Sequence, residues 1–123
     1  MKNNIYIGGN MQLEVKKVDI IVTMPKEHVD KIRTAICNAG AGKMGKYTFC
    51  TISSNIIGTF KPDDDATPYI GKQNELEFVE EIKLEVICDV EKVGEVLEII
   101  RQVHPYEEPG IDIIPLFSPE DFR

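Results

Sequence analysis

The stretch VDIIVTMPKEHVDKIRTAICNAG, residues 18–40, decides the fold of this chain. Its first seven residues place apolar side chains at every second position, which is the period of a β-strand with one buried face. Pro25 follows, at a position where a helix needs no N–H donor, and an apolar stripe with helical spacing runs from there to Gly40. Glycine is a common helix stop. The stretch therefore predicts a strand at Val18–Met24 that leads directly into an amphipathic helix.

The remainder of the chain repeats this strand–helix unit. Strands are predicted at Tyr47–Ser53, Phe78–Cys88 and Ile111–Leu116, and residues 55–73, rich in Gly, Pro and Asp, are predicted to form a loop. A second helix is expected after Asp89, which is placed to act as its N-cap. The order β-α-β-β-α-β predicts an α+β, ferredoxin-like sandwich with both helices on one face of the sheet.

The predicted sheet leaves its second face without helices. That face mixes polar with apolar side chains, and a half-apolar open face is commonly closed by self-association. Its members are expected to be Thr51, Lys83, Glu85, Tyr47, Phe49 and Ile87. The pattern therefore predicts a homo-oligomer.

Length and composition indicate one globular domain, which we assign to residues 17–123. Residues 1–16 form an N-terminal extension, in which Gly8-Gly9-Asn10 indicates a turn and a small hairpin. A net charge of −7 argues against nucleic acid and anionic membrane partners, because both attract basic surfaces. No apolar run approaches the roughly 18 residues that cross a bilayer, and no secretory signal is visible. Three widely spaced cysteines are typical of reduced thiols in a cytoplasmic protein.

A glycine-rich run, Gly40-Ala41-Gly42-Lys43-Met44-Gly45-Lys46, joins the first helix to the next strand. Its backbone N–H groups and two lysines could cradle a phosphate. However, phosphate loops of the Walker and Rossmann kinds run from a strand into a helix, and this run has the opposite order. A helix cap followed by a tight turn is the simpler interpretation. It predicts a positive φ at Gly42 or Gly45.

The run His104-Pro105-Tyr106-Glu107-Glu108-Pro109 is expected to form a stiff corner, because each proline fixes its own φ. His104, Glu107 and Glu108 are candidate ligands for zinc or copper, since imidazole and carboxylate groups bind these metals. The alternative is a structural His104 at the helix terminus, beside a carboxylate that raises its pKa. Asp63-Asp64-Asp65 could hold a hard cation, but it lacks the EF-hand spacing and is more typical of a solvated loop.

Several short motifs resemble the PII-like domain inserted in YqfO-type proteins, which are also described as NGG-interacting-factor-like or type-two GTP cyclohydrolase-like. The shared residues are Gly40-Ala41-Gly42, Gly45, Tyr47, Cys50, Gly58-Thr59-Phe60, Pro62, Pro68-Tyr69-Ile70-Gly71, Glu80-Glu81 and the run 104–109. The last motif is also similar to the one that ends CutA proteins, a trimeric PII-like family linked to divalent-cation tolerance. The resemblance covers about residues 18–117 and implies a ferredoxin-like fold and a homotrimer.

The resemblance does not carry an enzyme activity with it. YqfO-type proteins hold a two-metal site on flanking halves, and this chain, which resembles a free-standing insert, has neither half. No nucleophile–base pair stands out, so no catalytic residue is predicted. We therefore expect a non-enzymatic, trimeric PII/CutA-like binding or regulatory module for a small-molecule ligand, with a weak divalent-metal protein and a small enzyme at a subunit cleft as alternatives. The candidate ligand-binding residues are Gly42, Gly45, Tyr47, Tyr69 and Tyr106.

Overall fold

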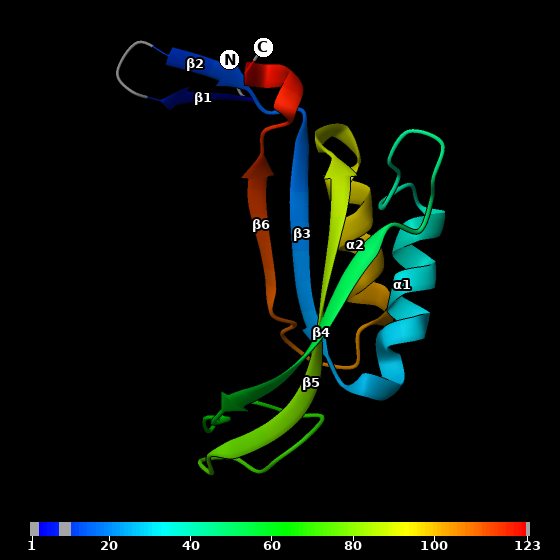
Figure 1. Ribbon diagram of the computed structural model, residues 1–123. Helices are drawn as coiled ribbons and strands as arrows, with labels where there is room; N and C mark the ends of the chain where they lie inside the picture. Colours follow the sequence, from blue (N-terminus) through cyan, green and yellow to red (C-terminus); the bar gives the residue numbers. More distant parts are fainter. Residues whose placement is uncertain (1–2, 8–10, 123) are drawn as a thin grey trace.

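Strand β3 (Lys17–Met24) lies inside a four-stranded antiparallel sheet in the computed structural model, which describes residues 3–7 and 11–122. The strand order is β4-β5-β3-β6, with β4 at Thr51–Phe60, β5 at Glu77–Asp89 and β6 at Ile111–Leu116. Helices α1 (Val29–Asn38) and α2 (Val93–Val103) both cover one face of this sheet (Figure 1). The arrangement is the predicted ferredoxin-like fold.

The core lies between the sheet and the two helices. In β3 buried and half-buried residues alternate, as the period of two predicts. Each helix begins with a 3₁₀ turn, at Lys26–His28 for α1 and Val90–Lys92 for α2, and then turns its apolar stripe toward the sheet. The largest fully buried side chains are Ile20, Met24, Ile32, Ile36, Leu84, Ile100, Val22, Val86 and Val96. Burying each of them stabilises the fold by about 1.5–3 kcal/mol.

Strand β4 differs most from its prediction. It begins at Thr51 rather than Tyr47, because Tyr47 forms an isolated bridge with Met44 and Phe49 has a φ of 57°, which is outside strand geometry. It then continues to Phe60, through residues predicted as loop, because every residue from Thr51 to Phe60 pairs with one residue of β5. The β4–β5 hairpin therefore extends beyond the helices (Figure 1).

The register corrects part of the predicted open face. Thr51 pairs with the buried Val86, so it lies on the helix side of the sheet, and Ile52 takes the open side. Asp89 precedes the second helix as predicted, but its side chain makes no cap hydrogen bond. Its carboxylate forms an ion pair with Lys17 instead.

The open face carries a pair of neighbouring carboxyl groups. Asp19 in β3 and Glu85 in β5 share a hydrogen bond on this face. Burial, and then this hydrogen bond, raise the pKa of Asp19 to about 6. Both residues line a shallow hollow together with Ile52 and Ile87.

The N-terminal segment forms a separate two-stranded sheet of β1 (Asn4–Ile7) and β2 (Met11–Glu14). This confirms the hairpin, although its predicted turn, residues 8–10, lies outside the described residues. Val15 is buried in the core and anchors the hairpin beyond the end of the sheet where β3 begins (Figure 1). No helix within residues 3–7 and 11–122 has the length and apolarity that a membrane crossing requires.

Candidate functional site

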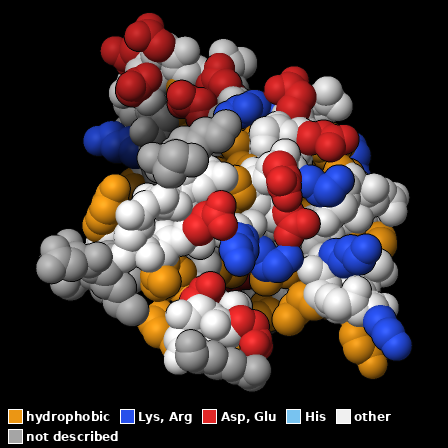
Figure 2. Space-filling view, turned by 90° about the horizontal axis from the view of Figure 1, so that it is seen from above, with side chains coloured by type: hydrophobic (Ala, Val, Ile, Leu, Met, Phe, Trp, Pro, Cys, Tyr) orange, Lys and Arg blue, Asp and Glu red, His pale blue; other side chains and the backbone are white. Residues whose placement is uncertain are grey.

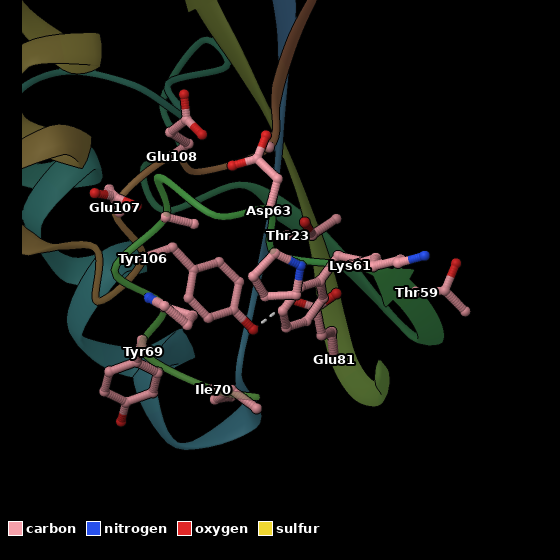
Figure 3. A pocket seen from close by; sticks show the side chains of 15 residues that line it. Thr23, Thr59, Lys61, Asp63, Tyr69, Ile70, Glu81, Tyr106, Glu107 and Glu108 are labelled. Atoms are coloured by element: carbon pink, nitrogen blue, oxygen red, sulfur yellow. Dashed lines mark hydrogen bonds between the residues drawn. The ribbon is translucent and has the colours of Figure 1, made fainter. Parts of the chain in front are cut away.

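A cavity of about 400 Å³ opens at the end of the sheet where β3 finishes. Its walls come from four parts of the chain: Thr23 in β3, Glu81 in β5, Tyr106 in the corner after α2, and Tyr69 in the loop after β4. Figure 3 shows these side chains around one hollow. The volume is in the range of small-molecule sites.

His104 holds the base of this site. It is the C-cap of α2 and only 8% exposed. Its Nε2 lies 2.7 Å from the carbonyl oxygen of Thr23, and its Nδ1 accepts the backbone N–H of Tyr106 at 3.0 Å. Nε2 must therefore carry the proton, and the neutral ring satisfies both neighbours. The imidazole of His104 therefore connects the corner, residues 104–109, to the end of β3.

The pKa of His104 moves in the direction opposite to the prediction. Burial is the largest cause and lowers its pKa, while the Thr23 carbonyl and the charge of Glu81 oppose that shift less strongly. The expected carboxylate is present nearby as Glu81, but it bonds Tyr106 rather than the imidazole. The predicted position at the helix terminus is confirmed.

Tyr106 and Glu81 form the polar centre of the cavity. The Tyr106 hydroxyl donates a hydrogen bond of 2.8 Å to Oε2 of Glu81, drawn as a dashed line in Figure 3. Glu81 is only 9% exposed. Burial, the hydrogen bond and the charge of Glu81 raise the pKa of Tyr106 well above its usual range, so the phenol keeps its proton.

Aromatic rings form the apolar wall. The ring centroid of Tyr106 lies 6.0 Å from that of Tyr69 and 6.5 Å from that of Phe60. The hydroxyl of Tyr69 lies 3.3 Å from Nε2 of His28, at the start of α1. Two of the three tyrosines predicted as ligand-binding residues, Tyr69 and Tyr106, therefore line one cavity.

The loop after β4 is held over this wall by polar contacts. Oε1 of Glu107 accepts the backbone N–H of Thr67 at 3.0 Å. Asp63 accepts the N–H of Asp65 at 3.2 Å, and Asp64 accepts a bond from the Asn74 side chain at 2.6 Å. All three aspartates are exposed, as the solvated-loop interpretation predicts, and the side chains of Asp63 and Asp64 accept hydrogen bonds within the loop.

The glycine-rich run lies elsewhere. Gly42 has a φ of 77° and Gly45 a φ of 58°, which confirms the predicted turn. The Gly42 N–H donates to the Ile87 carbonyl at 2.7 Å, so it is not free to cradle a phosphate. Ile87 and Glu81 are six residues apart on β5, about 20 Å along an extended strand. The structure thus separates Gly42, Gly45 and Tyr47 from the cavity lined by Tyr69 and Tyr106. Their role as ligand-binding residues stays a prediction.

The candidate metal ligands do not converge in a single protomer. In the part of the chain that the structure describes, no three His, Cys, Asp or Glu side chains form a group that could hold a metal ion. Both ring nitrogens of His104 are engaged, and Glu107 bonds Thr67. A zinc or copper site at His104, Glu107 and Glu108 stays a prediction.

The chain is similar in sequence to one segment of larger proteins. No family model matches it. It is 45% identical over 97 residues to a GTP cyclohydrolase 1 type 2 homolog of Halalkalibacterium halodurans and 43% identical to that of Bacillus subtilis. These matches cover 79% of this chain but only 26% of each relative. The similarity is to a segment. The chain spans about a quarter of the length of these relatives.

Superposition on solved structures identifies the fold. The Bacillus cereus protein related to NIF3 superposes with a TM-score of 0.74 at 34% identity, over 85% of this chain and 26% of that one. The CutA protein of Archaeoglobus fulgidus gives a TM-score of 0.64 at 21% identity, over 86% and 90% of the two chains. CutA1 of Pyrococcus horikoshii gives 0.64 at 17% identity, over 85% and 89%. The fold is therefore that of CutA proteins.

Proposed function

We propose that this chain is a non-enzymatic, homotrimeric binding or regulatory module of the PII/CutA kind, and that its ligand site is the cavity between Tyr69, Tyr106 and Glu81. The observation that carries the proposal is the preorganisation of this cavity. His104 fixes the backbone of Tyr106, and Tyr106 fixes the carboxylate of Glu81. A site that is already ordered loses little entropy when a ligand binds.

Exposed apolar residues on both edge strands support self-association. On β4, Ile52 and Ile57 are 69% and 70% exposed, and on β6, Ile113 and Ile114 are 42% and 46% exposed. These strands are opposite edges of one sheet. Contact between two different edges is heterologous, and such contacts form a ring when the rotation between subunits closes. The resemblance to CutA proteins makes a ring of three the expected size.

The chemistry of the cavity favours binding over catalysis. Tyr106 stays a neutral phenol, because its pKa is raised. The pKa of His104 is lowered, and both of its ring nitrogens are engaged in hydrogen bonds that hold the imidazole in place. Burial raises the pKa of the Cys37 and Cys88 thiols, which keeps them unreactive. The relatives' cyclohydrolase name describes proteins of which this chain matches only 26%.

Light scattering tests the assembly. A homotrimer has three times the 13.9 kDa mass of one chain. Replacing Ile52 by Asp places a charge on the apolar edge and should yield monomers. Thr34→Asp adds the same charge to an exposed position of α1 and should leave the trimer intact. A monomeric parent at micromolar concentration would contradict the proposal.

Weak divalent-metal binding is a second candidate, favoured by the presence of His104, Glu107 and Glu108 in one short corner. The CutA neighbours are named divalent cation tolerance proteins, which is consistent with it. His104 would have to release Thr23 or Tyr106, and a second subunit would have to supply further ligands. Calorimetric titration with zinc or copper decides the matter, since equal heats for the parent and His104→Ala would leave His104 a structural residue.

A third candidate, a small enzyme at a subunit cleft, gains one observation. Tyr106 and Glu81 do line a cavity, and His104 lies directly beneath it. Replacing Tyr106 by Phe would abolish such an activity while keeping the ring. Loss of any turnover in that variant, with its fold intact, would favour this candidate over the binding module.

A further inference from the structure

The cavity has an excess of negative charge. Four carboxylates and one ammonium group are among its lining residues: Asp63, Glu81, Glu107, Glu108 and Lys61. In Figure 3 the Lys61 side chain extends away from Tyr106, while Glu107, Glu108 and Asp63 stand around the opposite rim. Charges gathered in a concave site focus the field at its centre. The cavity therefore attracts cations and repels anions. Figure 2 shows a different end of the molecule, where basic side chains lie among acidic ones.

Glu81 is the most informative of these carboxylates. It is 9% exposed, and its Oε2 accepts the Tyr106 hydroxyl. No donor among residues 3–7 and 11–122 is hydrogen-bonded to its other oxygen, Oε1. No buried side-chain oxygen among the described residues lacks a hydrogen-bond partner, so Oε1 keeps contact with solvent in the cavity. The wall of the cavity thus offers one strong acceptor that the chain itself does not use.

Gly58 leaves the space that Oε1 of Glu81 occupies. A Cβ added at Gly58 would collide with Oε1 of Glu81, and it would lie 3.6 Å from Cδ of the same side chain. Gly58 is in β4, beside β5, so the missing side chain leaves room for the carboxylate. Any larger residue at this position would displace Oε1. The absence of a side chain at Gly58 therefore leaves room for Oε1, and Tyr106 holds the carboxylate through Oε2.

The remaining wall suits an apolar body rather than a bare ion. The ring centroid of Tyr106 lies 6.5 Å from that of Phe60 and 6.0 Å from that of Tyr69, and all three residues line the cavity. Aromatic faces attract cations and also cover methylene groups. A metal ion would need several converging ligands, and the described residues provide no such group here.

We propose that this cavity binds a small organic cation, with an ammonium or guanidinium group donating to Oε1 of Glu81 and an apolar body against Tyr106 and Tyr69. The proposal rests on the proposed function and names the ligand class of the same site. The acidic rim draws the cation in, and the cavity of about 400 Å³ limits the ligand to small-molecule size.

Calorimetry with three ligands of one shape tests the charge preference. Phenethylammonium is the cation, 2-phenylethanol its neutral counterpart, and 3-phenylpropanoate an anion. We expect the cation to bind the assembled parent protein at least about tenfold more tightly than the alcohol, and the anion not to bind. Added sodium chloride should weaken the binding of the cation, since the charges at the rim are exposed to solvent.

Matched variants test the residues. Glu81→Gln keeps the shape and the bond from Tyr106 but removes the charge, and should raise the Kd of phenethylammonium about tenfold. Asp63→Asn, at the exposed rim, should raise it about twofold and remains informative if Glu81→Gln does not fold. Lys61→Gln should lower it. Glu98→Gln makes the same charge change on the exposed surface of α2 and should have no effect.

The outcomes separate this inference from the proposed function. Equal binding of the alcohol and the amine, tighter binding of the anion, or the same loss in Glu98→Gln as in Glu81→Gln would overturn the cation site alone. If none of the three ligands binds at 10 mM, on the order of the weakest affinity that calorimetry detects, the cavity is not a ligand site and both proposals fail.

Discussion

Replacing Gly42 and Gly45 separately by alanine tests how the glycine-rich turn is held. Both residues have left-handed backbone, with φ of 77° and 58°, so either substitution costs roughly 1–2 kcal/mol in local strain. At Gly45 an added Cβ meets no atom within 4 Å. At Gly42 it would lie 3.1 Å from Sγ of Cys37 and 3.1 Å from the backbone nitrogen of Cys50, which is tighter than ordinary contact.

The difference between the two sites sets the expected magnitude. The Gly42 N–H donates to Ile87 in β5 at 2.7 Å, and its carbonyl accepts from Cys50, the residue before β4, at 2.8 Å. Moving Gly42 away from its neighbours weakens the bond to β5 and the bond from Cys50, at about 1 kcal/mol each. We expect Gly42→Ala to lower the free energy of unfolding by about 3 kcal/mol and Gly45→Ala by about 1 kcal/mol.

Urea unfolding followed by circular dichroism measures both values. Gly45→Asn is a useful control, because asparagine tolerates left-handed backbone and should cost less than alanine. Equal losses in the two alanine variants would refute the reasoning, since they would mean that the contacts of Gly42 add nothing to the backbone strain.

Three further predictions concern single side chains. The folded protein holds the Asp19 proton more tightly than the unfolded chain, with a pKa of about 6 against 3.8, so stability should fall as pH rises through this interval. The free energy of unfolding should therefore be lower at pH 7.5 than at pH 4.5. Asp19→Asn should reduce this difference by on the order of 1 kcal/mol, a value discounted for partial exposure, as measured by urea unfolding at the two pH values. Tyr106→Phe removes the donor to Glu81 and should cost about 1–2 kcal/mol at pH 7.5, whereas Tyr47→Phe, 75% exposed, should cost nothing measurable by thermal unfolding. His104→Ala removes two buried hydrogen bonds and should cost about 2–4 kcal/mol, and a loss below 0.5 kcal/mol would count against its place as the anchor of the corner.

The sequence predicts best where the signal is local. Strand β3 and helix α1 follow from one run of apolar periodicity, and β6 matches its predicted bounds. Strand β4 was placed wrongly, since Gly58 and the neighbouring turn residues suggested a loop. It is stabilised by pairing with β5, which is distant in sequence and leaves no periodic mark within β4.

The site is predicted only in part for the same reason. The corner that contains His104 and Tyr106 stands out because two prolines enclose a histidine and two carboxylates. The resemblance includes Glu81, but the strand pattern alone marks it as a polar residue, and its burial depends on the corner folding over it. The sign of the His104 pKa shift was missed because burial, which a sequence does not give, outweighs the nearby charge.

The central claim is that the Tyr106–Glu81 cavity is the ligand site of this chain. Backbone amide spectra of the isotope-labelled protein, recorded during a titration with phenethylammonium, test it most directly. The account predicts that the shifted amides cluster around Tyr69, Glu81 and Tyr106, and that the amides of Gly42 and Gly45, about 20 Å away along β5, stay unchanged. Shifts that cluster at the glycine-rich turn instead, or that are absent from the cavity, would contradict it.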